Sequence, residues 1–351
     1  MKRAALERFE YSAPTMGTMM RIVVYALDQA AAERVIHAGL DELERLIPIL
    51  NNYSAESEIS RLQSAFGSPQ AIGHELHEVL VAATRWRALS DGAFDISLGT
   101  LFRLWSKARK QKRLPSDEEL EAVRRTSGWD RWRLTPTEIP ADALDARDPR
   151  ASNASPSQIA SVELFAEGLI LDTSGLATGY ILDRVFEAME RTGHAHVLID
   201  IGGDIRVGAA PPDTRGWVVM VAGVSPSAPP LCRWFLESCA VTTSGDLNQF
   251  VEIGGRRYSH LMDPIAMQPL ERRQCVSVVA DTAIDADAGA TALCVLGMER
   301  GSRLFDRMPL REAYLLEIAA AAPGHSSPGH SSPGHGLSGI RLRRLVHDES
   351  L

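Results

Sequence analysis

Residues 169–201, LILDTSGLATGYILDRVFEAMERTGHAHVLIDI, decide the fold class. The apolar runs at the two ends, LILD and HVLIDI, are typical of strands. Between them a glycine-containing turn leads into a pattern that predicts a helix from about Tyr180 to Arg191. A strand, a helix and a second strand in this order predict an α/β fold with a mixed (α+β) arrangement.

The segments before this stretch continue the alternation. RIVVYA, from Arg21 to Ala26, is rich in β-branched residues and predicts a strand. Apolar residues then recur at helical spacing from Ile36 to Ile47, and Pro48 is expected to end that helix. A second helix is predicted near Glu75 to Leu89. Four apolar residues share its buried face: Leu76, Val79, Leu80 and Ala83.

The segments after it add a strand, a helix and a pair of strands. VSVVA (276–280) predicts a strand that leads into a helix from about Ile284 to Gly297. YLLEI (314–318) and GIRLRRLV (339–346) predict a strand pair. Between them, the low-complexity segment 322–337 repeats GHSSP; its histidines could bind a metal, but they lack a fixed scaffold, so we expect a disordered insertion.

The composition is that of a globular protein, and it fits either one large two-lobed domain or two domains. The chain has 45% hydrophobic and 23% charged residues, enough for a sizeable core. Segment 106–160, rich in Pro, Asp and Ser, is expected to form a surface helix and loops within it. The net charge of -8 argues against nucleic acid as a partner. The four cysteines have no close paired spacing, which argues against a zinc site or a disulfide framework.

The start of the chain predicts the location of the protein. It has no apolar run typical of a signal peptide, and no later stretch is apolar enough to span a bilayer. We therefore expect a cytoplasmic protein from the sequence as written. A longer native start would change this expectation to an exported or periplasmic protein.

The turn in LDTSGLATGY (171–180) is a candidate anion site. Small residues precede a helix there, and the N–H groups and positive dipole at the start of a helix attract anions such as phosphate. The same pattern fits an ordinary strand-to-helix connection in which Asp172 caps the helix. The residues leave both interpretations open.

The segment DADAGAT (285–291) is a candidate cation site. Asp287 and Thr291 are four residues apart, so on a helix their oxygens face the same way. Carboxylate and hydroxyl oxygens suit Mg²⁺, which completes its coordination with water and substrate phosphate. Alternatively, Asp285 or Asp287 caps the helix and Thr291 is simply buried.

Taken together and in this order, eight segments resemble the ApbE family of flavin transferases. They are MGT (16–18), NNYSAESEISRL (51–62), GAFDISLGTLFRLW (92–105), LDTSGLATGY (171–180), VLIDIGGDI (197–205), TTSGD (242–246), YSHLMDP (258–264) and DADAGATALCVLG (285–297). The resemblance implies a single domain over residues 1–351, with a fold of two lobes and FAD in the cleft between them. It also implies Mg²⁺ between the protein and the FAD pyrophosphate.

The resemblance extends to individual positions. It implies metal ligands at Asp287, Thr291 and the backbone carbonyl of Ala177. It implies flavin contacts at eight residues: Met16, Tyr53, Ala93, Phe94, Asp95, Ser174, Thr178 and Leu261. Thr178 stands where the family commonly has lysine, and residues 265–269 stand where it usually has a Thr-Gly turn.

His260 is the expected general base, which would take a proton from an acceptor hydroxyl. Asp263, three residues later, could orient the His260 ring. The alternative is a structural histidine against a strand.

The implied activity is transfer of FMN from FAD to a Thr or Ser hydroxyl of an acceptor flavoprotein subunit or domain, with release of AMP. Two other functions stay open: an Mg²⁺-dependent FAD pyrophosphatase that yields FMN and AMP, and an FAD-binding protein without chemistry. FAD is expected in all three, and Mg²⁺ is required for the two catalytic ones.

Overall fold

The largest element is an eight-stranded sheet in which every neighbouring pair of strands is antiparallel. The computed structural model describes residues 5–136, 160–221, 223, 228–246, 249–318 and 340–347. In spatial order the strands are β1 (Glu7–Thr15), β2 (Thr18–Ala26), β6 (Val197–Ile201), β7 (Asp204–Val207), β10 (Cys239–Gly245), β15 (Arg273–Ala280), β16 (Leu310–Ile318) and β17 (Ile340–Val346).

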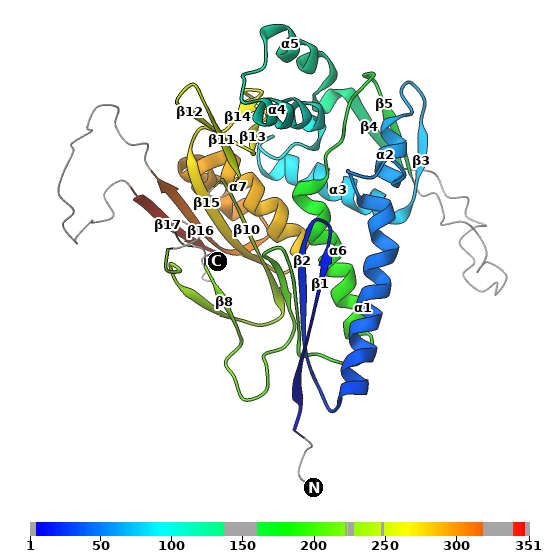
Figure 1. Ribbon diagram of the computed structural model, residues 1–351, viewed down its shortest axis with the longest axis vertical. Coiled ribbons are helices and arrows are strands. Elements are labelled where there is room, and N and C mark those ends of the chain that lie inside the picture. Colours follow the sequence, from blue (N-terminus) through cyan, green and yellow to red (C-terminus); the bar gives the residue numbers. More distant parts are fainter. Residues whose placement is uncertain are drawn as a thin grey trace, which may run out of the picture.

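Three long helices cover one face of this sheet (Figure 1). They are α1 (Gln29–Leu50), α6 (Ser174–Glu190) and α7 (Ala283–Leu304). Side chains alternate along each strand, so Ile22 and Val24 of β2 join the core beneath these helices, whereas Val23 points to the other face. There it packs in a second core with the hairpin of β8 (Trp217–Met220) and β9 (Arg233–Leu236).

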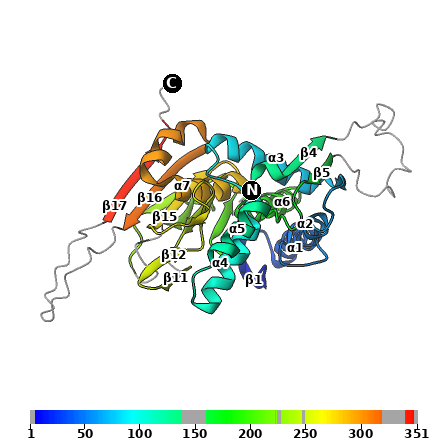
Figure 2. The ribbon, with the colours of Figure 1, turned by 90° about the horizontal axis from the view of Figure 1, so that it is seen from above.

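A second lobe is built from short helices and a small sheet. Its helices are α2 (Glu58–Gln63), α3 (His74–Leu89), α4 (Gly99–Gln111) and α5 (Asp117–Thr126), with 3-10 turns η1 (Ile96–Leu98) and η2 (Trp129–Arg131). Its sheet has the order β3 (Gln70–Ile72), β5 (Ala160–Leu164) and β4 (Trp132–Pro136). Helices α4 and α5 lie at the top of Figure 1, and Figure 2 looks down on that end.

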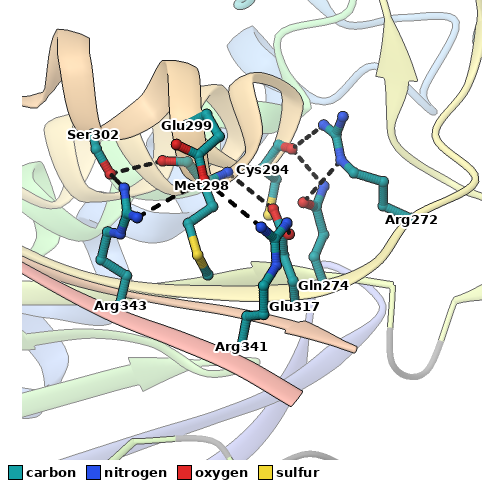
Figure 3. Close-up of polar contacts among 9 residues, drawn as sticks. All are labelled: Arg272, Gln274, Cys294, Met298, Glu299, Ser302, Glu317, Arg341 and Arg343. Atoms are coloured by element: carbon teal, nitrogen blue, oxygen red, sulfur yellow. Dashed lines mark hydrogen bonds and ion pairs between the residues drawn. The ribbon is translucent and has the colours of Figure 1, made fainter. Parts of the chain in front are cut away.

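Helix α7 is broken at Gly297, whose φ of 69° and ψ of −179° are not helical. Figure 3 shows how the two new helix ends are satisfied. The Arg272 guanidinium donates to the carbonyls of Cys294 (3.1 Å) and Val295 (2.7 Å), and the Glu317 carboxylate accepts the N–H of Met298 at 2.9 Å. Both helix ends at this kink therefore have hydrogen-bond partners.

The predicted mixed α/β fold is confirmed, as are most of its elements. RIVVYA lies in β2, HVLIDI in β6 and VSVVA in β15, and the two predicted C-terminal strands pair as β16 and β17. The predicted helices near 75–89 and 284–297 are α3 and α7.

The strand predicted at residues 169–172 is wrong. This segment bonds to η1 and the start of α4 in the second lobe: Asp172 donates its N–H to Ile96 O at 2.7 Å, and Gly99 donates to Ile170 O at 3.1 Å. Helix α6 then begins at Ser174 rather than near Tyr180, so Gly175 and the residues after it are helical.

The predicted end of α1 at Pro48 is also wrong. Pro48 lies inside the last turn, and the helix continues to Leu50. A proline lacks an N–H and removes one helical hydrogen bond, but the Asn51 N–H still closes the turn on Ile47 O at 3.1 Å.

Two predicted surface segments fall partly or wholly outside the described residues. Of segment 106–160, residues 106–136 contain the end of α4, then α5, η2 and β4, and residues 137–159 lie outside. The low-complexity segment 322–337 lies wholly outside. Within the described ranges, none of the helices has both the length and the apolar character needed to cross a membrane.

Candidate functional site

A cavity of about 190 Å³ opens where α6, α7 and β10 meet the segment before α4. Eight residues singled out from the sequence line it: Ala93, Phe94, Asp95, Ser174, His260, Leu261, Asp287 and Thr291. Asp172, Gly175 and Ser244 add further polar atoms. Residues far apart in the chain therefore share one site.

Asp287 and Thr291 lie one turn apart on α7, as their spacing predicted. The Asp287 carboxylate is buried and accepts the N–H of Gly179 at 3.2 Å, and the hydroxyls of Thr291 and Ser244 are 3.3 Å apart. Burial, together with the nearby Asp204 carboxylate, raises the pKa of Asp287 well above its usual range. No ion pair reaches Asp287 from the part of the chain that the structure describes. A buried carboxylate in this setting fits a divalent cation.

The start of α7 is capped by other residues. Asp183 accepts the N–H groups of Ala283 (2.8 Å) and Ile284 (3.0 Å), and the Thr282 hydroxyl accepts that of Asp285. The Asp285 carboxylate accepts the Trp86 indole N–H at 2.9 Å. Asp287 is therefore not the helix cap and can serve the cavity.

The candidate third ligand, Ala177, is buried in α6 and does not line the cavity. Gly175 does. A Cβ at Gly175 would lie 3.5 Å from the Thr291 hydroxyl oxygen and 3.3 Å from the Phe94 ring. The backbone of α6 thus comes close to Thr291 at Gly175.

In the turn before α6, Thr173 is the N-cap residue and Asp172 directly precedes it. Asp172 accepts the N–H of Ser174 at 3.0 Å and so stabilises the helix start. The same carboxylate oxygen accepts the Asn52 amide at 3.1 Å, which ties the 51–53 loop to α6. Ser174 and Asp172 also line the cavity, so the start of this helix faces the space where an anion was expected.

Asp95 is held in place on the opposite wall. Its carboxylate accepts the N–H (2.8 Å) and hydroxyl (2.5 Å) of Ser97, so Asp95 caps the 3-10 turn η1. Burial is the largest influence on Asp95 and raises its pKa.

His260 follows β12 (Arg256–Ser259), which forms a hairpin with β11 (Phe250–Ile253). Its Nδ1 lies 3.2 Å from the carbonyl oxygen of Gln249, so Nδ1 carries the proton and Nε2 is left as the basic nitrogen. Burial lowers the pKa of His260, and Arg109 lowers it further, while Asp246 raises it.

Asp263 does not orient His260. Its carboxylate accepts the N–H groups of Ile265 (2.8 Å) and Ala266 (3.0 Å). These bonds shape the turn between β13 (Met262–Asp263) and β14 (Gln268–Pro269), in which Met267 adopts a φ of 54°. The turn thus closes without the glycine that the family usually has there.

Three predicted flavin contacts lie outside this cavity. Met16 lies in the β1–β2 turn and lines a separate, open hollow with its neighbours 14–19. Tyr53 is 91% exposed and lines a neighbouring cavity of about 440 Å³ that also contains Asn52 and Arg103. Thr178 is half-buried in α6 and lines neither.

Sequence reasoning missed two charged residues near the site. Loss of contact with water raises the pKa of Asp204 to about 6, and its charge acts on Asp287. Arg109 lies in segment 106–160, which was predicted to be a surface helix and loops, yet it is half-buried and its charge acts on His260. Asp204 lies in the segment VLIDIGGDI (197–205) but was not named as a site residue, and no motif spacing points to Arg109, because the influence of both residues depends on tertiary neighbours.

The chain is similar to known proteins in both sequence and structure. The model described as "ApbE family" matches residues 16–315. A curated relative from Vibrio cholerae, named FAD:protein FMN transferase, is 28% identical over 303 residues, which cover 84% of this chain and 83% of the relative. A relative of the same name from Escherichia coli K12 is 25% identical, with 84% and 80% covered. The apo structure of Pseudomonas stutzeri flavinyl transferase ApbE is 27% identical, with a TM-score of 0.74 over 91% of this chain and 94% of that one.

Proposed function

Because the chain belongs to the ApbE family, we propose that it is an FAD:protein FMN transferase. It moves FMN from FAD to a Thr or Ser hydroxyl of an acceptor protein and releases AMP. The observation that carries this proposal is the convergence of Asp287, Thr291, Ser174 and His260 on one cavity. Oxygen donors for a cation, the start of a helix and a base are the groups that phosphoryl transfer requires.

Mg²⁺ is the metal that this donor set suits. Asp287 and Thr291 would hold it, together with a backbone carbonyl of α6. Ala177 is the carbonyl implied by family resemblance, and Gly175 is the α6 residue that lines the cavity beside Thr291. When bound, the cation neutralises charge on the pyrophosphate.

The protein's own groups position the reactants. The His260 Nε2 takes the proton from the acceptor hydroxyl, whose oxygen attacks the FMN phosphorus while AMP leaves. A lowered pKa keeps His260 neutral near pH 7, which is the form that accepts a proton. The first turn of α6 directs its positive end at the phosphates.

FAD extends beyond the cavity of about 190 Å³, because sites for ligands smaller than FAD already span about 300–1,000 Å³. The neighbouring cavity beside Tyr53 is the natural extension. The hydrogen bond from Asn52 to Asp172 joins the two, since Asn52 lines one cavity and Asp172 the other. We place the flavin contacts at Ala93, Phe94, Asp95, Ser174 and Leu261 in the first cavity and at Tyr53 in the second.

One assay separates the three candidate functions. Purified protein is incubated with FAD, Mg²⁺ and an acceptor domain, and the products are measured by mass spectrometry. A gain in acceptor mass equal to FMN identifies the transferase. Free FMN and AMP without that gain identify the pyrophosphatase, and unchanged FAD identifies a binding protein.

The variant His260→Gln provides the control. It should bind FAD with Mg²⁺ as tightly as the wild type but transfer no FMN. Full transfer by this variant would refute the role of His260.

A further inference from the structure

A buried ion pair, Asp246 with Arg257, lies beside the cavity without lining it. The Arg257 Nε donates to the Asp246 carboxylate at 2.9 Å, and its Nη2 donates to the Asp246 backbone oxygen at 2.6 Å. The second carboxylate oxygen accepts the N–H of Gln274 at 2.9 Å. The Asp246 residue is fully buried, and the Arg257 guanidinium lies over the Phe250 ring. Each of the two ions is therefore held by the partner ion and by at least one further contact.

The pair connects the hairpin that carries His260 to the main sheet. Arg257 belongs to β12, three residues before His260, whereas Asp246 directly follows β10. Within the hairpin, the backbone N–H and the ring Nδ1 of His260 both contact the carbonyl of Gln249. The ring is thus held by its own hairpin, and the position of the hairpin sets the position of the ring.

The same contacts continue to the helix that carries Asp287 and Thr291. Gln274, whose N–H binds Asp246, donates its side-chain amide to the carbonyl of Cys294, as Figure 3 shows. Cys294 lies on α7, three residues after Thr291. Gln274 of β15 therefore binds both Asp246, which anchors the hairpin, and Cys294, near the end of the α7 segment that precedes Gly297.

Stabilisation of the fold alone is a weak explanation for a buried ion pair. Removing two charges from water is costly, and well-packed apolar residues in place of a buried pair are often as stable or more so. What the pair provides is one defined geometry, because its donors and acceptors match in only one arrangement.

We propose that Asp246 and Arg257 are positioning residues that hold His260 at a fixed place relative to Asp287 and Thr291. This inference rests on the transferase function proposed above. It adds the residues through which the base is aligned with the metal-binding helix.

The chain offers a matched control in the next residue. Arg256 lies on the same strand, but its partner Glu271, at 2.9 Å, is on the surface and both side chains are exposed. Arg257→Gln and Arg256→Gln remove the same charge from neighbouring positions. Arg257→Lys keeps the charge and loses the two-point geometry.

Steady-state kinetics test the positioning role. We expect Arg257→Gln to lower kcat for FMN transfer about 10- to 100-fold with KM for FAD within about threefold, since a misplacement of about 1 Å can cost 10²-fold in rate. Arg256→Gln should match the wild type, and Arg257→Lys should recover part of the loss. Equal kcat values for the Arg256 and Arg257 variants would overturn the proposal, as would a rise in KM that accounts for the whole effect. If Arg257→Gln does not fold, Arg257→Lys decides: a lowered kcat supports positioning and a wild-type kcat overturns it.

Histidine NMR supplies a readout that needs no turnover. The charges that act on His260 are Arg109, which lowers its pKa, and Asp246, which raises it. Asp246→Asn should therefore lower the pKa of His260, with the resonance assigned from His260→Gln, whereas Arg256→Gln should leave it unchanged. If the His260 pKa is the same in Asp246→Asn as in Arg256→Gln, the proposed link between Asp246 and His260 is overturned, even if the wild type proves inactive as a transferase. Absence of transfer by the wild type alone would refute only the proposed function.

Discussion

Replacing Gly179 with alanine tests the close contact between α6 and α7. A Cβ at Gly179 would lie 2.3 Å from the carbonyl oxygen of Ala283 and 2.7 Å from the Cα of Ile284, about 1 Å closer than an ordinary contact. The atoms it meets are backbone atoms at the start of α7, where Asp183 binds the N–H groups of Ala283 and Ile284. They cannot rotate away, so the helices must move apart.

The size of the effect follows from two opposing contributions. Overpacking of a tight interface costs roughly 1–3 kcal/mol and sometimes more. Alanine is the better helix former and returns about 1 kcal/mol. Because the clash at Gly179 is with backbone, we expect the upper part of the range, a net loss of about 2 kcal/mol in the free energy of unfolding. The shift of α7 also moves Asp287, whose carboxylate binds the Gly179 N–H.

Gly175, one turn earlier on the same helix, supplies the control. A Cβ there meets only side-chain atoms, at 3.3 Å or more. Gly175→Ala should keep or raise stability, but its methyl group would crowd the cavity beside Thr291. Urea unfolding without ligand measures the stability of both variants, and calorimetry measures their affinity for FAD with Mg²⁺. We expect Gly179→Ala to lose stability and affinity, and Gly175→Ala to lose affinity alone. A Gly179→Ala protein as stable as the wild type would refute the helix contact.

Three further predictions concern the cation site, the base and the helix break. Asp287→Asn should abolish Mg²⁺-dependent transfer without lowering the thermal midpoint, because it removes a buried charge; unchanged turnover would contradict the metal assignment. Transfer should fall as pH drops through the pKa of His260, which burial places below its usual value of 6.5. Arg109→Gln should move that fall to higher pH, since the Arg109 charge lowers the same pKa; a pH–rate profile identical to the wild type would argue against it. Gly297→Ala should destabilise the protein by about 1–3 kcal/mol in urea unfolding, because φ of 69° with ψ of −179° is accessible almost only to glycine; an unchanged urea midpoint would contradict the break.

Local sequence patterns predicted the elements whose burial repeats regularly. RIVVYA was predicted as a strand from its β-branched residues, and in β2 these residues alternate, with Ile22 and Val24 in one core and Val23 in the other. The segment 169–172 has equally apolar residues, but its backbone bonds to Ile96 and Gly99, which are distant in the chain. Hydrophobicity reports burial and not the hydrogen-bond partner, so this error could not be avoided from local sequence.

The site residues likewise divide into those that the sequence predicted and those that it missed. Asp287 and Thr291 were found because helical spacing brings them together on α7. Asp204 was missed because its influence on Asp287 depends on how β7 and α7 pack, which no local spacing records. Family resemblance supplied Ala93 and Leu261, which have no chemical signature of their own and yet line the cavity.

The break in α7 divides one helix into two mechanical units. The part before Gly297 carries Asp287 and Thr291, and Arg272 binds its last carbonyls. The part after it starts at Met298, whose N–H binds the carboxylate of Glu317 on β16. Arg341 of β17 binds the same carboxylate. The part that carries the donors therefore ends at its own anchor, Arg272, whereas Glu317 and Arg341 hold the part that follows the break.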